Sequence, residues 1–130
     1  MSPMDGFPHG QTPGSLELAF VGDSVYDLYV RSALVRKGGR IRDLHKAAVQ
    51  CVNAHAQAEG LARIENLLTE EEAGVIRRAR NARQTPTKNA DAGEYHQATA
   101  LEALIGYLYL TGRIERMESL IEISLKKEEH

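Results

Sequence analysis

Residues 15–37 constrain the fold of this chain more than any other stretch, because their apolar side chains recur every three or four positions. That spacing predicts one long amphipathic helix whose apolar stripe consists of Leu16, Ala19, Phe20, Tyr26, Val30 and Leu34. Asp23 falls within this stripe, where a carboxylate costs several kcal/mol unless it is paired, hydrogen-bonded or bound to a cation. Gly22 beside it gives up about 1 kcal/mol of helix propensity relative to alanine. Two unfavourable residues side by side predict that this helix holds a functional site.

A second helical segment follows Gly38 and Gly39, which are expected to end the first helix. It begins near residue 41 and either continues to residue 68 or breaks near residues 53–55. Thr69 and Glu72 then have the spacing of a capping box, which predicts the start of another helix.

Two more helices are predicted at about residues 92–110 and 114–125, separated by Gly112. Residues 1–14 are rich in proline and glycine and are expected to form a flexible tail, which leaves residues 15–130 as the folded domain. The sequence contains no strand-like alternation. We therefore predict an all-α domain of six or seven helices.

The composition is that of one globular domain, with 130 residues of which 42% are hydrophobic and 26% charged. No run approaches the roughly 18 apolar residues of a membrane span, and no basic start followed by an apolar run indicates a secretory signal. Cys51 is the single cysteine, which excludes an intrachain disulfide and a cysteine-based metal site. We expect a cytoplasmic protein without a membrane partner.

Charge is segregated along the chain although its net value is only −2. From Arg31 to Lys88 lie 12 of the 16 lysines and arginines but 6 of the 18 acids, a local balance of about +6. This basic middle fits the binding of a polyanion through one face, and it also fits ordinary solvated helix faces.

A second acid in apolar surroundings is Glu102, in the most apolar predicted helix of the chain. Gly106, one turn later, would let a neighbouring helix come close. If the helices that carry Asp23 and Glu102 pack together, the two carboxylates converge and repel unless a cation lies between them. Hard oxygen ligands with open positions suit Mg²⁺. The alternative is that each acid caps a backbone group or pairs with a nearby arginine.

Two motifs resemble the catalytic domain of ribonuclease III. Residues 18–25, Leu-Ala-Phe-Val-Gly-Asp-Ser-Val, resemble its signature sequence, and residues 101–110, Leu-Glu-Ala-Leu-Ile-Gly-Tyr-Leu-Tyr-Leu, resemble its second acidic motif. The motifs occur in the family's order, and the resemblance extends from about residue 15 to residue 125. Residues 43–46, 80–82 and 87–89 resemble the short branch known as Mini-ribonuclease III, which lacks a double-stranded-RNA-binding domain. No such domain is expected after the last predicted helix.

The resemblance implies the helical fold of the ribonuclease III endonuclease domain and a two-fold homodimer that cleaves double-stranded RNA with Mg²⁺. For the short branch it implies cleavage of precursor large-subunit (23S) ribosomal RNA, leaving 5′-phosphate and 3′-hydroxyl ends. A large-subunit ribosomal protein is left open as a further partner. The alternative function is a non-catalytic double-stranded-RNA-binding or ribosome-associated module that retained the fold. Retention of two acids on a phosphate-facing surface argues against that alternative.

The catalytic and metal-binding roles of the family carry over to Asp23 and Glu102 alone. Ala19 stands where ribonuclease III has a glutamate, Thr99 where it has an aspartate, and Ile41 lies close to a further expected acid. The short branch has the same losses. Fewer carboxylates imply weaker metal binding or a larger share of water ligands. They also give no reason to expect a second metal ion at a fixed position.

RNA must be gripped by the catalytic domain itself, because no separate binding domain is expected, and double-stranded RNA is contacted mainly at phosphates and 2′-hydroxyls. Candidates for phosphate contacts are Lys46, Arg77, Arg78, Arg80, Arg83 and Lys88. Candidates for 2′-hydroxyl contacts are Asn81, Thr85, Thr87 and Asn89. The loop at residues 84–93 is either a substrate-gripping element or a solvent-exposed turn.

The signature helix contributes to the dimer interface in this family. The expected interface residues here are Phe20, Val21, Val25 and Tyr29, because the helix has more apolar surface than one core stripe needs. Two further residues have open roles. Asp27 either orients a water or holds a basic partner, and His45 is either a neighbour of the catalytic site or a hydrogen-bonded structural residue.

Overall fold

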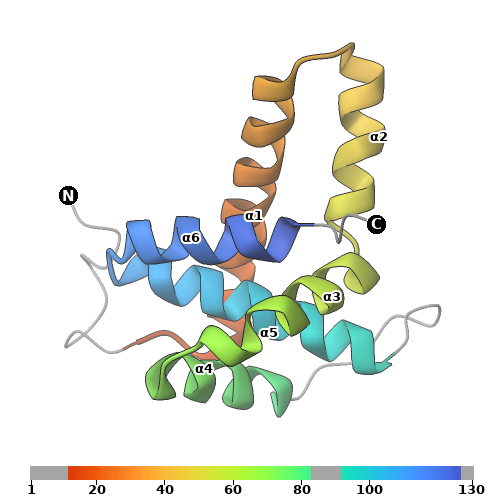
Figure 1. Ribbon diagram of the computed structural model, residues 1–130. Coiled ribbons are helices and arrows are strands. Elements are labelled where there is room, and N and C mark those ends of the chain that lie inside the picture. The colour runs from red at the N-terminus through yellow and green to blue at the C-terminus, as the bar shows by residue number, and fades with distance from the viewer. Residues whose placement is uncertain (1–11, 83–91, 127–130) are drawn as a thin grey trace.

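The computed structural model describes residues 12–82 and 92–126, which form a bundle of α-helices with one short 3-10 helix (Figure 1). In chain order the elements are α1 (Ser15–Lys37), α2 (Ile41–Cys51), α3 (Ala54–Ile64), η2 (Glu65–Leu67), α4 (Glu70–Arg80), α5 (Ala92–Leu110) and α6 (Ile114–Leu125). These described residues contain no strand, so the prediction of an all-α fold with six or seven helices is confirmed. None of the helices is both long and apolar enough to cross a membrane. Most of the predicted tail at residues 1–14 lies outside the described residues.

Helix α5 is the centre of the fold, and α1, α3, α4 and α6 all pack against it (Figure 1). From Ala98 to Leu110 every residue is buried except Glu102 and Tyr109, which are half-buried. A helix surrounded by other helices cannot keep a polar face, which explains why this segment is apolar on all sides. Glu102 is the single acid within that stretch.

Helices α1 and α5 cross with their backbones in direct contact at Gly22 and Gly106. A Cβ atom placed on Gly22 would lie 1.7 Å from the carbonyl oxygen of Glu102, and one on Gly106 would lie 2.0 Å from that of Leu18. The contact leaves room for a hydrogen atom but not for a methyl group. The expectation that Gly106 lets a neighbouring helix approach is confirmed, and Gly22 does the same on α1. The crossing also places Asp23 beside Glu102.

The buried face of α1 differs from the predicted stripe and consists of Leu18, Ala19, Gly22, Val25, Tyr26 and Val30. Phe20 is 82% exposed and Leu16 is 41% exposed, so the prediction that both belong to the core stripe is wrong. The closest approach to α5 is possible only at Gly22, and this contact rotates the buried face away from Phe20. Asp23 therefore lies at the exposed rim of the crossing and not in the core.

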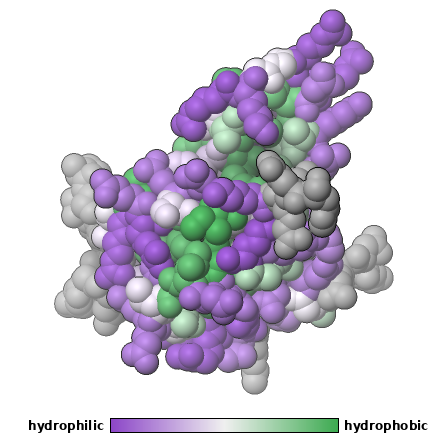
Figure 2. Space-filling view, viewed as in Figure 1, coloured by the Kyte–Doolittle hydropathy of each residue, from purple (hydrophilic) through white to green (hydrophobic). Residues whose placement is uncertain are grey.

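The second half of α1 and the whole of α2 project from the bundle as a helical hairpin, here called the arm (residues 28–51; Figure 1). Gly38 and Gly39 make the reversal between the two helices with φ angles of +86° and +134°, which favour glycine. Ala48 is the one buried residue of α2. Figure 2 shows apolar surface on the arm among hydrophilic side chains. The large apolar side chains exposed there are Leu28, Val35, Ile41 and Val49.

The predicted second helical segment is two helices, because the chain breaks at Val52 and Asn53. The Asn53 side chain accepts a hydrogen bond from the backbone N–H of Ala56 at 2.8 Å and donates one to the carbonyl of Val49 at 2.9 Å. One side chain thus caps the start of α3 and the end of α2. The predicted capping box of α4 is also present between Thr69 and Glu72.

Candidate active site

The centre of the candidate site is the pair of carboxyl groups of Asp23 on α1 and Glu102 on α5. Asp23 is exposed and Glu102 is half-buried, and the two side chains lie within hydrogen-bonding reach of each other. Burial, the hydrogen bond with Asp23 and the charge of Asp23 together raise the pKa of the Glu102 carboxyl to about 8. Without a cation, the Glu102 carboxyl therefore favours its protonated form near neutral pH.

Gln57 on α3 completes the immediate surroundings of Glu102. Its side chain is 4% exposed, and its Nε2 donates a hydrogen bond to Oε2 of Glu102 at 3.4 Å. Donation to the charged carboxylate lowers the pKa of Glu102, against the larger effect of burial. Gln57 was missed in the sequence. Its position in the repeat of buried residues Gln57, Leu61 and Ile64 is the signal that could have identified it.

The two carboxylates suit a hard divalent cation, because they offer oxygen ligands and are held at one point. In the described part of the chain, no group of three or more His, Cys, Asp or Glu side chains is placed to hold a metal. Positions 19 and 99, where ribonuclease III has acids, carry no carboxylate here. Ala19 is buried, and the Thr99 hydroxyl donates to the Tyr95 carbonyl at 3.0 Å. The other ligands of an ion at Asp23 and Glu102 would have to be water or substrate oxygens.

A hollow of about 370 Å³ lies beside Asp23 between α1 and α2. His45 and Asp27 line it, together with Arg31. Asp27 accepts a hydrogen bond from Nε of Arg31 at 2.9 Å, which gives it the basic partner that was one of its two predicted roles. His45 is exposed and makes no hydrogen bond to the side chains that the structure describes, so the predicted structural bond is not found there.

The predicted RNA-binding residues other than Arg80 divide into three groups. Arg77, Arg78 and Asn81 are exposed at the C-terminal end of α4, and Lys46 is exposed on α2. In Figure 1 α2 and α4 lie at opposite ends of the molecule, so one chain does not bring Lys46 together with the α4 arginines. The third group lies outside the described residues and consists of Arg83, Thr85, Thr87, Lys88 and Asn89, with most of the predicted loop at 84–93.

Arg80 differs from the exposed Arg77 and Arg78, because it is half-buried and its guanidinium is paired with side chains of neighbouring elements. Its Nε donates to Oε1 of Gln97 at 2.7 Å, and its Nη2 pairs with the carboxylate of Glu65. These bonds join α4 to the first turns of α5 and to η2. In the structure Arg80 links helices, and its predicted phosphate contact stays a prediction.

The four predicted interface residues lie on different sides of α1. Phe20 is fully presented to solvent, Val21 and Tyr29 are half-buried, and Val25 is only 8% exposed within the chain's own core. Val25 thus offers little surface to a partner. The outward apolar side of α1 consists instead of Leu16, Phe20, Leu28 and Val35.

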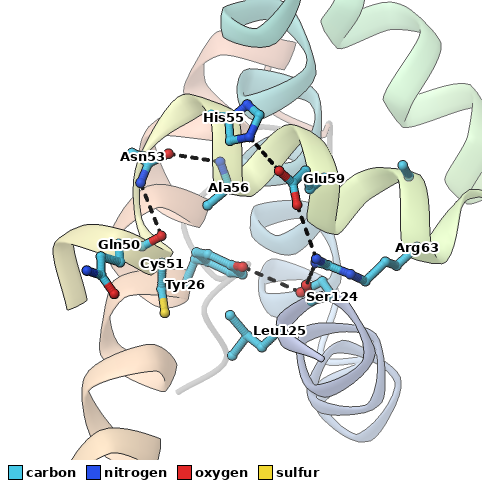
Figure 3. A pocket seen from close by; sticks show the side chains of 11 residues that line it. Tyr26, Gln50, Cys51, Asn53, His55, Ala56, Glu59, Arg63, Ser124 and Leu125 are labelled. Atoms are coloured by element: carbon cyan, nitrogen blue, oxygen red, sulfur yellow. Dashed lines mark hydrogen bonds and ion pairs between the residues drawn. The ribbon is translucent and has the colours of Figure 1, made fainter. Parts of the chain in front are cut away.

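A larger hollow of about 780 Å³ lies on the other side of α3, against α1 and α6 (Figure 3). The hydroxyls of Tyr26 and Ser124 lie 3.5 Å apart at its base. Arg63 donates to the Ser124 carbonyl at 2.6 Å and pairs with Glu59, which in turn contacts His55. These contacts fix α3 to α6, and the hollow itself contains no paired carboxylates of the Asp23–Glu102 kind.

Comparisons with known proteins identify the family to which the chain is similar. The family model described as "Ribonuclease III domain" matches residues 16–113. Among curated proteins, a Mini-ribonuclease 3 of Thermoanaerobacter sp. (strain X514) is 46% identical over 113 residues, covering 85% of this chain and 80% of that protein. A Mini-ribonuclease 3 of Brevibacillus brevis is 48% identical over 109 residues, covering 82% and 81%. The crystal structure of protein FN1578 from Fusobacterium nucleatum, 33% identical, superimposes with a TM-score of 0.82 over 98% of this chain and all of that one.

Proposed function

Because the chain belongs to the ribonuclease III family and is an endoribonuclease of its Mini-ribonuclease 3 branch, we propose that it cleaves double-stranded regions of precursor 23S ribosomal RNA. The reaction would take place in the cytoplasm and leave 5′-phosphate and 3′-hydroxyl ends. The observation that carries the proposal is the meeting of Asp23 and Glu102 at the glycine crossing of α1 and α5.

Asp23 and Glu102 would hold Mg²⁺, which when bound supplies Lewis-acid activation of water and neutralises charge that develops on the phosphate. The chain's own contribution is to fix the positions of the two carboxylates before substrate arrives, since both project from helices whose backbones touch. Asp23, at the exposed rim, faces the side from which a phosphate can approach. Arg77 and Arg78 are exposed cations suited to phosphates farther along a duplex.

The direct test is cleavage of a 23S precursor stem by the wild type and by Asp23→Asn. Metal-dependent catalysis contributes several kcal/mol, so the variant should cut about 10³-fold more slowly or worse. Cleavage by the wild type should require Mg²⁺ and stop in EDTA. Asp43→Asn removes an exposed acid on α2 and serves as the matched control with near-wild-type activity.

Three results would contradict the proposal. RNA binding without any cutting would favour the non-catalytic binding module. Cutting that survives Asp23→Asn would exclude Asp23 from the site. Equal cutting of the precursor stem and of an unrelated duplex of the same length would remove the ribosomal RNA as the preferred substrate.

We further propose that the active form is a homodimer that buries the outward apolar side of α1, with Phe20 at its centre. Phe20 is 82% exposed, and solvent-exposed aromatic rings of this kind are typical anchors of protein interfaces. Phe20→Asp should weaken dimerisation by about 30-fold or more, measured by sedimentation equilibrium. Leu67→Asp, at an exposed apolar residue on η2, should leave the dimer intact. A wild type that is monomeric at micromolar concentration would contradict this proposal.

A further inference from the structure

Gln57 is a buried polar residue whose side chain faces the candidate site. The other buried polar side chains in the described residues have structural partners. Glu72 binds Arg116 and the cap of α4, Thr99 donates to the Tyr95 carbonyl, and Ser124 donates to the Ile121 carbonyl. The amide of Gln57 has one described hydrogen bond, and it goes to the Glu102 carboxylate. A buried amide costs free energy unless it is used, so this contact indicates a role at the site.

The element that presents Gln57 is fixed on several sides. Asn53 caps its first turn, and Arg63 ties its last turn to the Ser124 carbonyl of α6 (Figure 3). His55 contacts Glu94 at the start of α5. Gly60 packs against α6 so closely that an added Cβ would lie 3.0 Å from the Ser124 carbonyl oxygen. These contacts fix α3 to its neighbours, and α3 in turn holds the Gln57 amide in a defined position.

Glu102 needs such support more than Asp23 does. Its side chain has one more rotatable bond than aspartate, and among the described residues Asp23 is the one other carboxylate at the site. With two protein ligands, each misplaced oxygen removes a large part of the ion's binding free energy. The N–H of Gln57 engages Oε2 of Glu102 and so restrains the orientation of the whole carboxylate.

We propose that Gln57 is a positioning residue, whose amide holds the Glu102 carboxylate in the orientation that allows Glu102 and Asp23 to share one divalent cation. The inference rests on the proposed function, because it assigns Gln57 to the metal that the site is proposed to hold. Partners of this kind, which orient a metal ligand, change metal affinity by about 10- to 100-fold when they are removed.

Gln57→Met keeps the length of the side chain and removes its N–H donor. Titration calorimetry with Mg²⁺, without RNA, should show binding about 10- to 100-fold weaker than in the wild type. The Mg²⁺ concentration for half-maximal cleavage should rise by the same factor, while KM for RNA stays unchanged. Saturating Mg²⁺ should restore most of kcat. Gln50→Met, at an exposed glutamine of α2, is the matched control and should match the wild type.

A Gln57→Met protein that binds Mg²⁺ like the wild type would overturn the inference, whatever its thermal stability. If Gln57→Met does not fold, Gln57→Leu is measured in the same way, and failure of both to fold would make Gln57 a structural residue and overturn the inference too. If the wild type itself neither binds Mg²⁺ nor cleaves RNA, it is the proposed function that fails. If the wild type binds Mg²⁺ and Gln57→Met binds it equally well, only the proposed role of Gln57 is rejected.

Discussion

Replacing Glu102 by glutamine should lower RNA cleavage by about 10³-fold or more and at the same time stabilise the metal-free protein. Activity falls because one of two carboxylate ligands is lost. Stability rises because a neutral amide removes a half-buried acid that faces Asp23. A residue kept for packing would show the opposite, since its loss would destabilise the fold and affect activity only indirectly.

The gain in stability should depend on pH. The folded-state pKa of Glu102 is raised to about 8, above its ordinary value of 4.5, so folding favours the protonated form. The contribution of this group to stability is fully present below pH 4.5 and is lost as the pH rises to about 8. The advantage of Glu102→Gln should therefore grow from acid to alkaline pH, amount to several kcal/mol near pH 8 and level off above it.

Urea unfolding in EDTA between pH 5 and pH 9 measures this difference directly. Glu122→Gln, at an exposed glutamate of α6, is the matched control and should follow the wild type at every pH. A Glu102→Gln protein that is less stable than the wild type at pH 8 would show that the carboxylate pair is not strained. Adding Mg²⁺ should stabilise the wild type more than the variant, because only the wild type keeps both ligands.

The second large effect is expected at the helix crossing. Gly22→Ala would place a methyl group 1.7 Å from the carbonyl oxygen of Glu102, and no rotation of a side chain can relieve a clash with backbone. Helices α1 and α5 would have to separate along their whole contact, at a cost of about 4 kcal/mol or more. Because a domain of this size has about 5–15 kcal/mol of stability, we expect a protein that is largely unfolded or barely stable.

Gly74→Ala is the matched control for this prediction. Gly74 is also a buried helical glycine, but an added Cβ there would meet only the ends of two arginine side chains, Arg78 at 3.2 Å and Arg77 at 3.8 Å. Those flexible groups can move, and alanine improves helix propensity, so stability should change by less than about 1 kcal/mol. Circular dichroism and urea unfolding of both variants distinguish the cases. Native stability in Gly22→Ala would mean that the two helices are not in backbone contact.

Local signals in the sequence predicted much of the helical framework. The boundaries of α5, the capping box at Thr69 and Glu72, and the helix ends at Gly38 and Gly112 all depend on neighbouring residues, and each is present. The pairing of Gly22 with Gly106 was also predictable, because each glycine weakens its own helix and so needs a compensating contact. The catalytic and RNA-binding roles of the site residues stay predictions.

The sequence pattern could not predict contacts between side chains that are far apart along the chain. Arg80 belongs to a basic run and was assigned to RNA, but its partners Glu65 and Gln97 are 15 and 17 positions away along the chain. Gln57 lies 45 positions from Glu102, and nothing local joins the two. The exposure of Asp23 was misjudged for a related reason. A period of three to four residues identifies a helix, but the neighbouring helix determines which side of it is buried.

The backbone contact between Gly22 and Glu102 also determines how this site can change over evolutionary time. The spacing of the two carboxylates is fixed by main-chain atoms that touch, and not by the size of the surrounding core side chains. Leucine, isoleucine and valine can therefore be exchanged elsewhere in the bundle without moving one carboxylate relative to the other. The core side chains of this fold can therefore vary while the spacing of the Asp23 and Glu102 carboxylates stays the same.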